Sequence, residues 1–257
     1  DMVLVIDVGN TNIVVGCIDD EKTYFIERLS TVRTKTELEY AIDLKNVLDI
    51  YKIHRKEIEG GIVCSVVPQV TNIIKLAAEK ILKKNIMVVG PGVKTGLNIL
   101  MDNPAQLGSD LVAAAVAGIA EYPVPLILID MGTATTVCVV DGKKNYIGGM
   151  ILPGVGVSLD ALTARASQLH GISLEAPKHL IGKNTIECMK SGVIYSSAAG
   201  LDGIITRINE ELGEEATVVA TGGLAKSIIP HCRQRIIQDD DLLLKGLKII
   251  YDKNRNS

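Results

Sequence analysis

Residues 4–19 read LVIDVGNTNIVVGCID, and this stretch decides the fold. The apolar run before Asp7 is too short for a helix and rich in β-branched residues, so it predicts a buried strand. Residues 9–12 (GNTN) predict a tight turn, because Gly and Asn accept the positive φ angles that such turns need. The β-branched run 13–18 predicts a return strand. The stretch therefore predicts a hairpin with a carboxylate at the end of its first strand.

Such a loop can bind a phosphate through its backbone N–H groups, while the carboxylate holds a hydrated Mg²⁺ beside it. An ordinary hairpin with an aspartate at its tip explains the same residues, because a D-x-G pattern is expected about once by chance in a chain of this composition. Residues 126–141 (LILIDMGTATTVCVVD) repeat the pattern, with Asp130 in the place of Asp7 and Gly132 in the place of Gly9. A repeat near half the chain length predicts two similar domains that face each other across a cleft, which favours the phosphate interpretation.

The composition agrees with two α/β domains. At 257 residues and 47% hydrophobic, the chain suits two domains of about 120 residues each, and with no Trp and one Phe the cores must rest on Ile, Val, Leu and Ala. A formal net charge of −3 gives no basic surface for nucleic acid or acidic lipid, so the expected partners are small molecules. No apolar run reaches the ~18 residues that a membrane span needs, and we expect a cytoplasmic protein.

Cysteine and histidine follow no metal or disulfide pattern. The five cysteines are scattered, with no C-x-x-C pair, and are interpreted as core residues. The four histidines have no H-E-x-x-H or similar spacing. Neither a disulfide framework nor a zinc site is therefore expected.

The rest of the first half alternates helices and strands. Periodic apolar residues predict a helix over 36–51, started by a T-x-x-E capping box, and Pro68 opens a second helix. Residues 60–67 and 86–89 predict strands. Three antiparallel strands followed by alternating helices and strands suggest a ribonuclease H-like unit.

Asp110 is the candidate base of the first half. A helix is expected to begin near Pro104, which places Asp110 in its early turns. The helix dipole would keep the carboxylate ionised and able to accept a hydrogen bond from a substrate hydroxyl. An acidic residue placed only for that dipole explains the same position.

The second half repeats the order of the first. Strands are expected over 126–151, followed by a helix from about 158 to 170 and by a long helix that Thr185 could cap. The strand 217–220 leads into TGGLA, residues 221–225, whose paired glycines would let the backbone approach a flat ligand or a phosphate closely. On its own this motif is a weak indication.

Together, the motifs carry a family resemblance. The loops DVGNTN and DMGTATT, followed by TGGLA, resemble the phosphate 1, phosphate 2 and adenosine motifs of the superfamily of acetate and sugar kinases, heat-shock ATPases and actin. With N-P-x-x-L-G-S-D before an Ala-rich helix and K-N-T before a helix, the chain more narrowly resembles type III pantothenate kinases, from residue 2 to about 251. The resemblance implies an α/β fold duplicated as in actin. Its two ribonuclease H-like domains would be 1–121, with the phosphate 1 loop and the acceptor-site helix, and 122–257, with the phosphate 2 and adenosine motifs.

The resemblance also implies an activity, the transfer of the ATP γ-phosphate to the terminal hydroxyl of pantothenate, which is the first step towards coenzyme A. On the family pattern Asp110 is the general base, Asp7 lies near Mg²⁺, and Asp130 helps to hold a monovalent cation, K⁺ or NH4⁺. The residues implied to bind ATP are Asp7, Val8, Gly9, Asn10, Thr11, Asn12, Ile13, Val14, Thr133, Gly222 and Gly223. Those implied to bind the acceptor are Met101, Gly108, Ser109, Asp110, Leu111 and Thr185, the last reaching across the interface of a homodimer.

Two positions depart from the family pattern at the acceptor site. The family has an arginine where this chain has Leu111, and an aromatic residue where it has Met101. Losing a guanidinium that pairs with a carboxylate costs roughly a hundredfold or more in rate constant, so another donor, Lys94 or Arg165, would have to meet the pantothenate carboxylate. Two alternatives stay open: a kinase of the same fold with a different small acceptor, and a non-catalytic ATP-binding regulatory protein.

Overall fold

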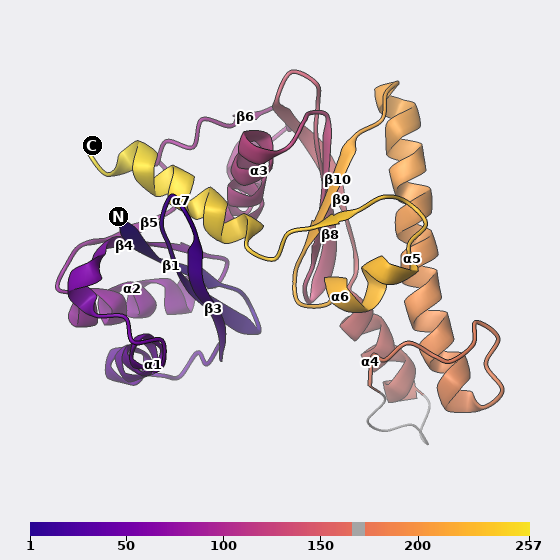
Figure 1. Cartoon of the computed structure of the whole chain (residues 1–257), viewed down its shortest axis with the longest axis horizontal. Coiled ribbons are helices and arrows are strands. Elements are labelled where there is room, and N and C mark those ends of the chain that lie inside the picture. Colours follow the sequence, from indigo (N-terminus) through magenta and orange to yellow (C-terminus); the bar gives the residue numbers. More distant parts are fainter. Residues whose placement is uncertain (166–172) are drawn as a thin grey trace. The chain divides into compact units, whose positions relative to one another are not determined.

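The computed structural model describes residues 1–165 and 173–257, which form two compact units (Figure 1). The first unit comprises Asp1–Leu97, Asn103–Ala120 and Asp241–Ser257, and the second comprises Asn98–Asp102 and Glu121–Asp240. Within the described residues, no helix combines the length and the apolar character that crossing a membrane requires.

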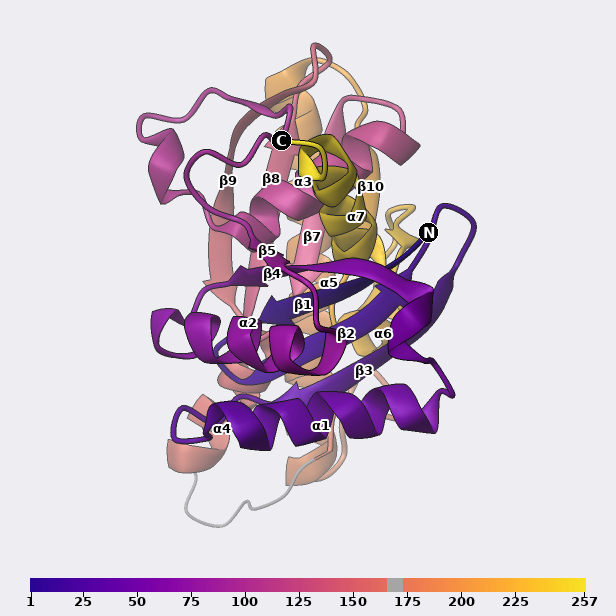
Figure 2. The same ribbon diagram turned by 90° about the vertical axis from the view of Figure 1, so that its left-hand side faces the viewer.

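The first unit is a mixed five-stranded sheet covered by helices. The strands are β1 (Met2–Val8), β2 (Asn12–Ile18), β3 (Thr23–Ser30), β4 (Ile58–Ser65) and β5 (Ile86–Val88), in the order β3-β2-β1-β4-β5. The first three are antiparallel neighbours, and β4 and β5 run parallel to β1. The helices α1 (Glu37–Ile50) and α2 (Pro68–Leu82) lie side by side against one face (Figure 2). The opposite face contacts α7 (Leu242–Asn254).

The central strand β1 shows why its residues form this element. Leu4, Ile6 and Val8 pack into the core beneath α1 and α2, while Val3 and Val5 are equally buried on the opposite face. A strand buried on both faces must be apolar at successive positions, and this is the pattern that the run before Asp7 shows. The hairpin predicted from residues 4–19 is confirmed as β1 and β2.

The predicted capping box at the start of α1 is also confirmed. Thr36 Oγ1 accepts a hydrogen bond from the Glu39 N–H at 3.3 Å, and the Glu39 carboxylate accepts one from the Thr36 N–H at 2.7 Å. Two backbone donors that the helix leaves unpaired are thereby satisfied.

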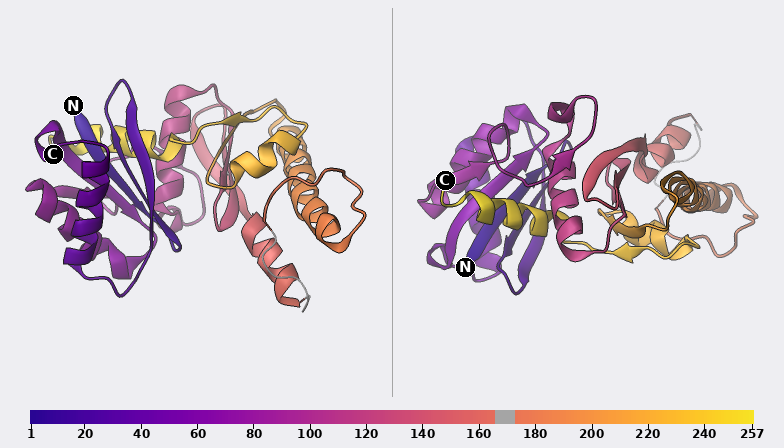
Figure 3. Two further views of the ribbon diagram at one scale, coloured as in Figure 1. Left: turned by 60° about the horizontal axis from the view of Figure 1, so that its bottom comes forward. Right: turned by 90° about the horizontal axis from the view of Figure 1, so that it is seen from above.

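The second unit repeats this architecture with a six-stranded sheet. Most of this unit is drawn in pink to orange in Figure 3. Its strands are β6 (Asn98–Ile99), β7 (Leu126–Met131), β8 (Ala134–Val140), β9 (Asn145–Pro153), β10 (Thr217–Thr221) and β11 (Ile237–Gln238), in the order β11-β10-β7-β8-β9-β6. Its helices are α4 (Val155–Arg165), α5 (Thr185–Leu212) and α6 (Ala225–Ile228). Buried residues of α5 share one core with β7, β8 and β10.

The internal repeat of the sequence corresponds to a repeat of topology. In each unit an antiparallel hairpin, β1–β2 or β7–β8, is extended by a third antiparallel strand, and a later strand pairs in parallel with the first strand of the hairpin. Asp7 and Asp130 occupy equivalent positions near the ends of β1 and β7. The prediction of a duplicated α/β fold is thus visible in the strand order.

The units differ from the predicted division at residues 121 and 122. The last helix, α7, belongs to the first unit, because Leu244, Leu247 and Ile250 are buried there. Residues 98–102 belong to the second unit, because β6 pairs with β9. A division by position along the chain could not place α7 with the first unit, because the sheet that a helix covers depends on contacts distant in sequence.

Two helix starts also differ from prediction. The helix expected over 158–170 begins at Val155, and the end of that expected range lies outside the described residues. Pro104 begins a separate 3₁₀ turn, η2 (Pro104–Gln106), and α3 (Ser109–Glu121) starts five residues later. Asp110 therefore lies in the first turn of its helix.

Candidate active site

The predicted phosphate loop is the turn between β1 and β2. The Gly9 N–H donates to the Asn12 carbonyl at 2.9 Å, and the Thr31 hydroxyl donates to the Gly9 carbonyl at 2.7 Å. Of the eight loop residues predicted to bind ATP, Asn10, Thr11 and Asn12 are exposed, whereas the side chains of Val8 and Ile13 are fully buried. The last two can therefore offer a ligand only their backbone groups.

Asp7 lies at the base of this loop and faces Cys64 on the neighbouring strand. The β1–β4 register pairs the two residues directly, and the Cys64 thiol donates a hydrogen bond to Asp7 Oδ1 at 3.2 Å. The Asp7 carboxylate is half-buried, and Cys64 is fully buried. Asp7 is thus a carboxylate oriented by its own sheet.

The start of α3 carries the predicted acceptor residues Gly108, Ser109, Asp110 and Leu111, all half-buried. The Gly108 carbonyl accepts the N–H groups of Leu111 and Val112 at 3.1 Å each, which closes the first turn. Burial raises the pKa of the Asp110 carboxyl, and the backbone N–H groups of Asp110 and Leu111 only partly offset that effect. The backbone N–H groups at the helix start act in the predicted direction, but burial has the larger effect on this pKa.

Electrostatics connect this helix start to Asp7. Burial raises the pKa of the Cys64 thiol well above its usual range, and the negative charges of Asp7 and Asp110 raise it further, while the Ser109 hydroxyl acts in the opposite direction. Asp7, Cys64, Ser109 and Asp110 therefore form one interacting group within the first unit. Sequence reasoning missed Cys64, because its contact with Asp7 depends on the register of two parallel strands distant in sequence.

The second unit gathers its predicted residues at the ends of β7 and β10. The register pairs Asp130 with Thr221, so the loop after β7 and the TGGLA turn emerge side by side. The Leu224 N–H donates to the Met131 carbonyl at 3.2 Å. Gly222 has a φ of +101°, and a Cβ there would lie 2.6 Å from the Met131 carbonyl oxygen, so this position requires glycine.

Thr133, Gly222 and Gly223 thus border the same end of the second sheet, where Thr133 and Gly223 are exposed. Gly154 closes that loop from the other side, because any side chain there would overlap the Thr133 carbonyl. Asp130 faces Thr136 across β7 and β8, and the buried Thr136 Oγ1 has no hydrogen-bond partner among the described residues.

The remaining predicted acceptor residues lie in the second unit. Met101 is exposed in the short segment after β6. Thr185 is exposed at the first helical position of α5, but Asn184 caps that helix by accepting the Glu187 N–H at 2.9 Å. The predicted capping role of Thr185 is therefore wrong, because the amide of the preceding residue fills it, and the Thr185 side chain is left to face outward.

The donor set fits a metal ion that arrives with a nucleotide. Among the described residues, no three His, Cys, Asp or Glu side chains come together to form a metal site. Mg²⁺ is typically held by one or two carboxylates together with substrate phosphates, so the single carboxylate of Asp7 beside a phosphate loop fits it.

The comparisons identify the relatives of this chain. A model of the type III pantothenate kinase family matches residues 3–207. A type III pantothenate kinase of an Exiguobacterium species is 47% identical over 254 residues, which cover 99% of this chain and 100% of that protein. The type III pantothenate kinase of Halalkalibacterium halodurans is 44% identical over 253 residues, which cover 98% and 100%.

Solved structures with the same fold are more distant in sequence. MreB 5 of Spiroplasma citri bound to AMPPNP has a TM-score of 0.56 at 10% identity, covering 99% of this chain and 97% of that one. A ROK family glucokinase of Streptomyces griseus in complex with glucose and AMPPNP has a TM-score of 0.53 at 11% identity, covering 100% of both. A Campylobacter jejuni protein described as a Baf family transcriptional activator has a TM-score of 0.58 at 19% identity, covering 99% and 100%. At these identities the likeness concerns the fold alone, and it confirms the duplicated actin-like architecture.

The family model spans most of the chain, and the two relatives match it from end to end. Kinases of this kind use a divalent metal with ATP. The resemblance inferred from the motifs is confirmed, and the chain belongs to the type III pantothenate kinase family.

Proposed function

We propose that this protein transfers the γ-phosphate of ATP to the terminal hydroxyl of pantothenate, the first step of coenzyme A biosynthesis. The observation that carries the proposal is the arrangement of Asp7, Cys64 and Asp110 in one unit of a chain from this family. Phosphoryl transfer depends on positioning and charge neutralisation, so a phosphate loop, one metal-binding carboxylate and one base are sufficient. Because the donor is ATP, we also propose a cytoplasmic location.

The roles follow from the placement of the residues. Asp7 and the backbone of residues 8–14 would hold the ATP phosphates, where bound Mg²⁺ would neutralise their charge. Thr133, Gly222 and Gly223 would contact the nucleotide from the second unit. Asp110 would accept the proton of the acceptor hydroxyl. The oxygen of that hydroxyl would bond to the γ-phosphorus, while the bond between the γ-phosphorus and the oxygen that leaves with ADP breaks.

The experiment that tests this function measures ADP formation with Mg²⁺ and K⁺, with and without pantothenate, for the native chain and for Leu111→Arg. We expect pantothenate-dependent turnover in the native chain, with another group in the place of the guanidinium. Lys94 is the candidate in the first unit, since it is exposed and its backbone is fixed by two hydrogen bonds with Asn254, of 2.9 and 2.8 Å.

Other outcomes of that experiment support the alternatives. Activity that appears only in Leu111→Arg would mean a different acceptor, one without a carboxylate, which the half-buried apolar Leu111 would suit. Absence of turnover in both would contradict the kinase proposal and favour a non-catalytic ATP-binding protein.

The monovalent cation, K⁺ or NH4⁺, would bind at Asp130. The supporting observation is Thr136, because directly opposite residues of an antiparallel pair present their side chains on the same face. A buried hydroxyl without a partner costs about 1–3 kcal/mol, and a bound cation would satisfy its oxygen.

Replacing Thr136 with valine keeps the shape of the side chain and removes that oxygen. We expect the KCl concentration needed for half-maximal activity to rise about tenfold, as is usual when a group supporting a metal site is lost. The KCl-dependent increase in the midpoint of thermal unfolding, measured without substrates, should shrink in parallel. Thr136→Ser is the control that keeps the hydroxyl, and an unchanged KCl response in Thr136→Val would contradict the site.

The homodimer is supported by unpaired surface on the second unit. Thr185 is flanked by Ile181 and Ile186, whose side chains are 80% and 48% exposed. Further along α5, the helix that begins at Thr185, Gly200 and Gly203 have open space beside them. Exposed apolar groups and a small-residue helix face are features that a second copy would cover.

Replacing Ile181 with aspartate should therefore separate the copies. We expect a native mass of twice the chain mass by sedimentation equilibrium, and a shift towards the monomer in Ile181→Asp. Ile50, which is 71% exposed on α1 of the first unit, provides the control Ile50→Asp, which should leave the mass unchanged. A native monomer, or an equal effect of both substitutions, would contradict this interface.

A further inference from the structure

Cys64 is a buried thiol in a position that packing alone does not explain. It lies next to the end of β4, is 0% exposed, and pairs in register with Asp7. Its sulfur is 3.2 Å from Asp7 Oδ1, within hydrogen-bonding distance for a thiol donor. The thiol therefore links the Asp7 carboxylate to the neighbouring strand β4.

The same side chain also interacts with the helix start that carries the base. Ser109 and Asp110 interact with the Cys64 side chain from the start of α3. Cys64 is thus the residue that both the nucleotide side and the acceptor side of the first unit share.

We propose that Cys64 is a positioning residue for phosphoryl transfer, whose thiol fixes the Asp7 carboxylate in the orientation that binds the Mg²⁺ of Mg-ATP. This inference rests on the proposed function. Groups that hydrogen-bond to a metal ligand fix its rotamer before the metal binds, and in a poorly solvated site even a weak donor reduces the number of orientations available to a carboxylate.

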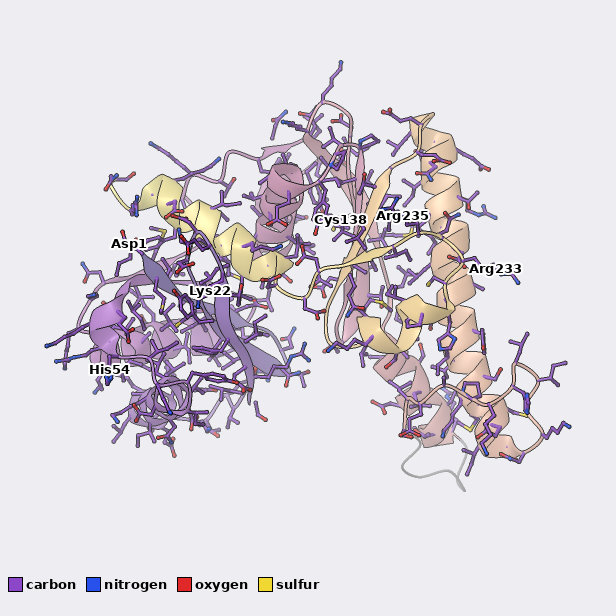
Figure 4. All side chains as sticks on the ribbon, in the orientation of Figure 1. Asp1, Lys22, His54, Cys138, Arg233 and Arg235 are labelled. Carbon is purple, nitrogen blue, oxygen red and sulfur yellow. The ribbon has the colours of Figure 1, made fainter. Side chains whose placement is uncertain are left out.

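The other buried thiols show what a structural cysteine looks like in this chain. Cys17 is 0% exposed on β2 of the same sheet, where it belongs to the core beneath α1 and α2. Cys138 lies in the second sheet (Figure 4), where its sulfur accepts a hydrogen bond from the Tyr146 hydroxyl at 3.0 Å. Cys17 and Cys64 are both 0% exposed and lie in the same sheet, so Cys17 is a matched control for Cys64 in burial and in sheet.

The first test needs neither nucleotide nor metal. The S–H stretching band of Cys64, identified by infrared difference between the native protein and Cys64→Ser, should lie at lower frequency than that of Cys17, identified in the same way. Replacing Asp7 with alanine should raise the Cys64 frequency and leave the Cys17 band in place. A Cys64 band at the frequency of an unbonded thiol, or one unaffected by Asp7→Ala, would overturn the inference.

The second test measures the Mg²⁺ response. In Cys64→Ala we expect the Mg²⁺ concentration for half-maximal turnover to rise about tenfold, with the KM for the acceptor unchanged, and Cys64→Ser should restore the native value because its hydroxyl also donates. Cys17→Ala removes the same atom from an equally buried position of the same sheet, so it should lower the thermal midpoint by a similar amount without changing the Mg²⁺ response.

Two results of these assays would overturn the proposal. One is a Mg²⁺ concentration for half-maximal turnover that is the same in Cys64→Ala and in the native protein. The other is an increase of that concentration in Cys17→Ala as large as the increase in Cys64→Ala. Failure of the proposed function is distinguishable from failure of this inference. If no acceptor is phosphorylated, two measurements still test the inference, because neither needs turnover. The first is the infrared comparison, and the second is the Mg²⁺ dependence of ATP binding, measured by calorimetry for Cys64→Ala, Cys64→Ser and Cys17→Ala.

Discussion

Replacing Asp110 with asparagine is expected to lower the kcat of phosphoryl transfer by about 10²–10⁴-fold, the usual contribution of a general base. The amide has nearly the same shape as the carboxylate but cannot accept the proton of the acceptor hydroxyl. Affinity for Mg-ATP should stay within about twofold of native, since the phosphate loop and Asp7 belong to the β1–β2 hairpin and not to α3.

The pH dependence of the native enzyme should carry the signature of the same residue. Asp110 must be ionised to act as a base, so activity should fall as the pH drops through its pKa, which burial raises above that of an ordinary aspartate. The acid limb of the kcat/KM profile should therefore lie at higher pH than that ordinary value, and in Asp110→Asn the residual activity should lose this limb.

Thermal stability distinguishes a catalytic from a structural role for Asp110. The pKa of Asp110 is raised in the native state. Between the pKa of the unfolded chain and that of the native protein, the native state therefore binds more protons than the unfolded state. The free energy of unfolding consequently falls as the pH rises through that window. At neutral pH the buried charge is unfavourable, so Asp110→Asn should unfold at the same or a higher temperature than native. The surface carboxylate Asp49, replaced by asparagine, is a control for both assays. Full activity in Asp110→Asn would contradict the assignment.

The parts of the site that could be predicted from sequence are those encoded within short stretches. The loop after Asp7 and the loop after Asp130 were predictable because strand, turn and return strand are local patterns, and repetition supplied the relation between them. Contacts between strands distant in sequence could not be predicted in this way. The pairing of Cys64 with Asp7 depends on the register of two parallel strands 57 positions apart, which no local pattern specifies.

The environment of Asp110 illustrates a second limit. Its helical position could be predicted, and the helix dipole suggested a carboxylate that ionises easily. Burial decides the direction of the pKa shift instead, and burial depends on what packs over α3. The same limit applies to α7, because the sheet that a helix covers depends on contacts distant in sequence.

The packing of α7 on α3 leads to the largest stability effect that we expect. Gly246 lies where the two helices cross, and a Cβ there would overlap the backbone carbonyl of Ala113, which is itself fully buried. Lys248 also connects α7 to the turn between β2 and β3, because its ammonium is 2.9 Å from the Asp20 carboxylate. Neither helix can therefore shift without disturbing buried contacts.

Replacing Gly246 with valine should destabilise the protein by about 3 kcal/mol, the upper end of the usual cost of overpacking, because the obstructing atoms are backbone and cannot rotate away. That corresponds to a decrease of roughly 6–12 °C in the midpoint of thermal unfolding followed by circular dichroism. Lys253→Val introduces the same β-branched side chain at an exposed position of α7 and should cost about 1 kcal/mol or less.

Because Ala113 follows Asp110 by one turn of α3, Gly246→Val should also lower kcat at temperatures where the variant is still folded. A native midpoint together with native activity would contradict the packing of α7 on the helix that carries the base.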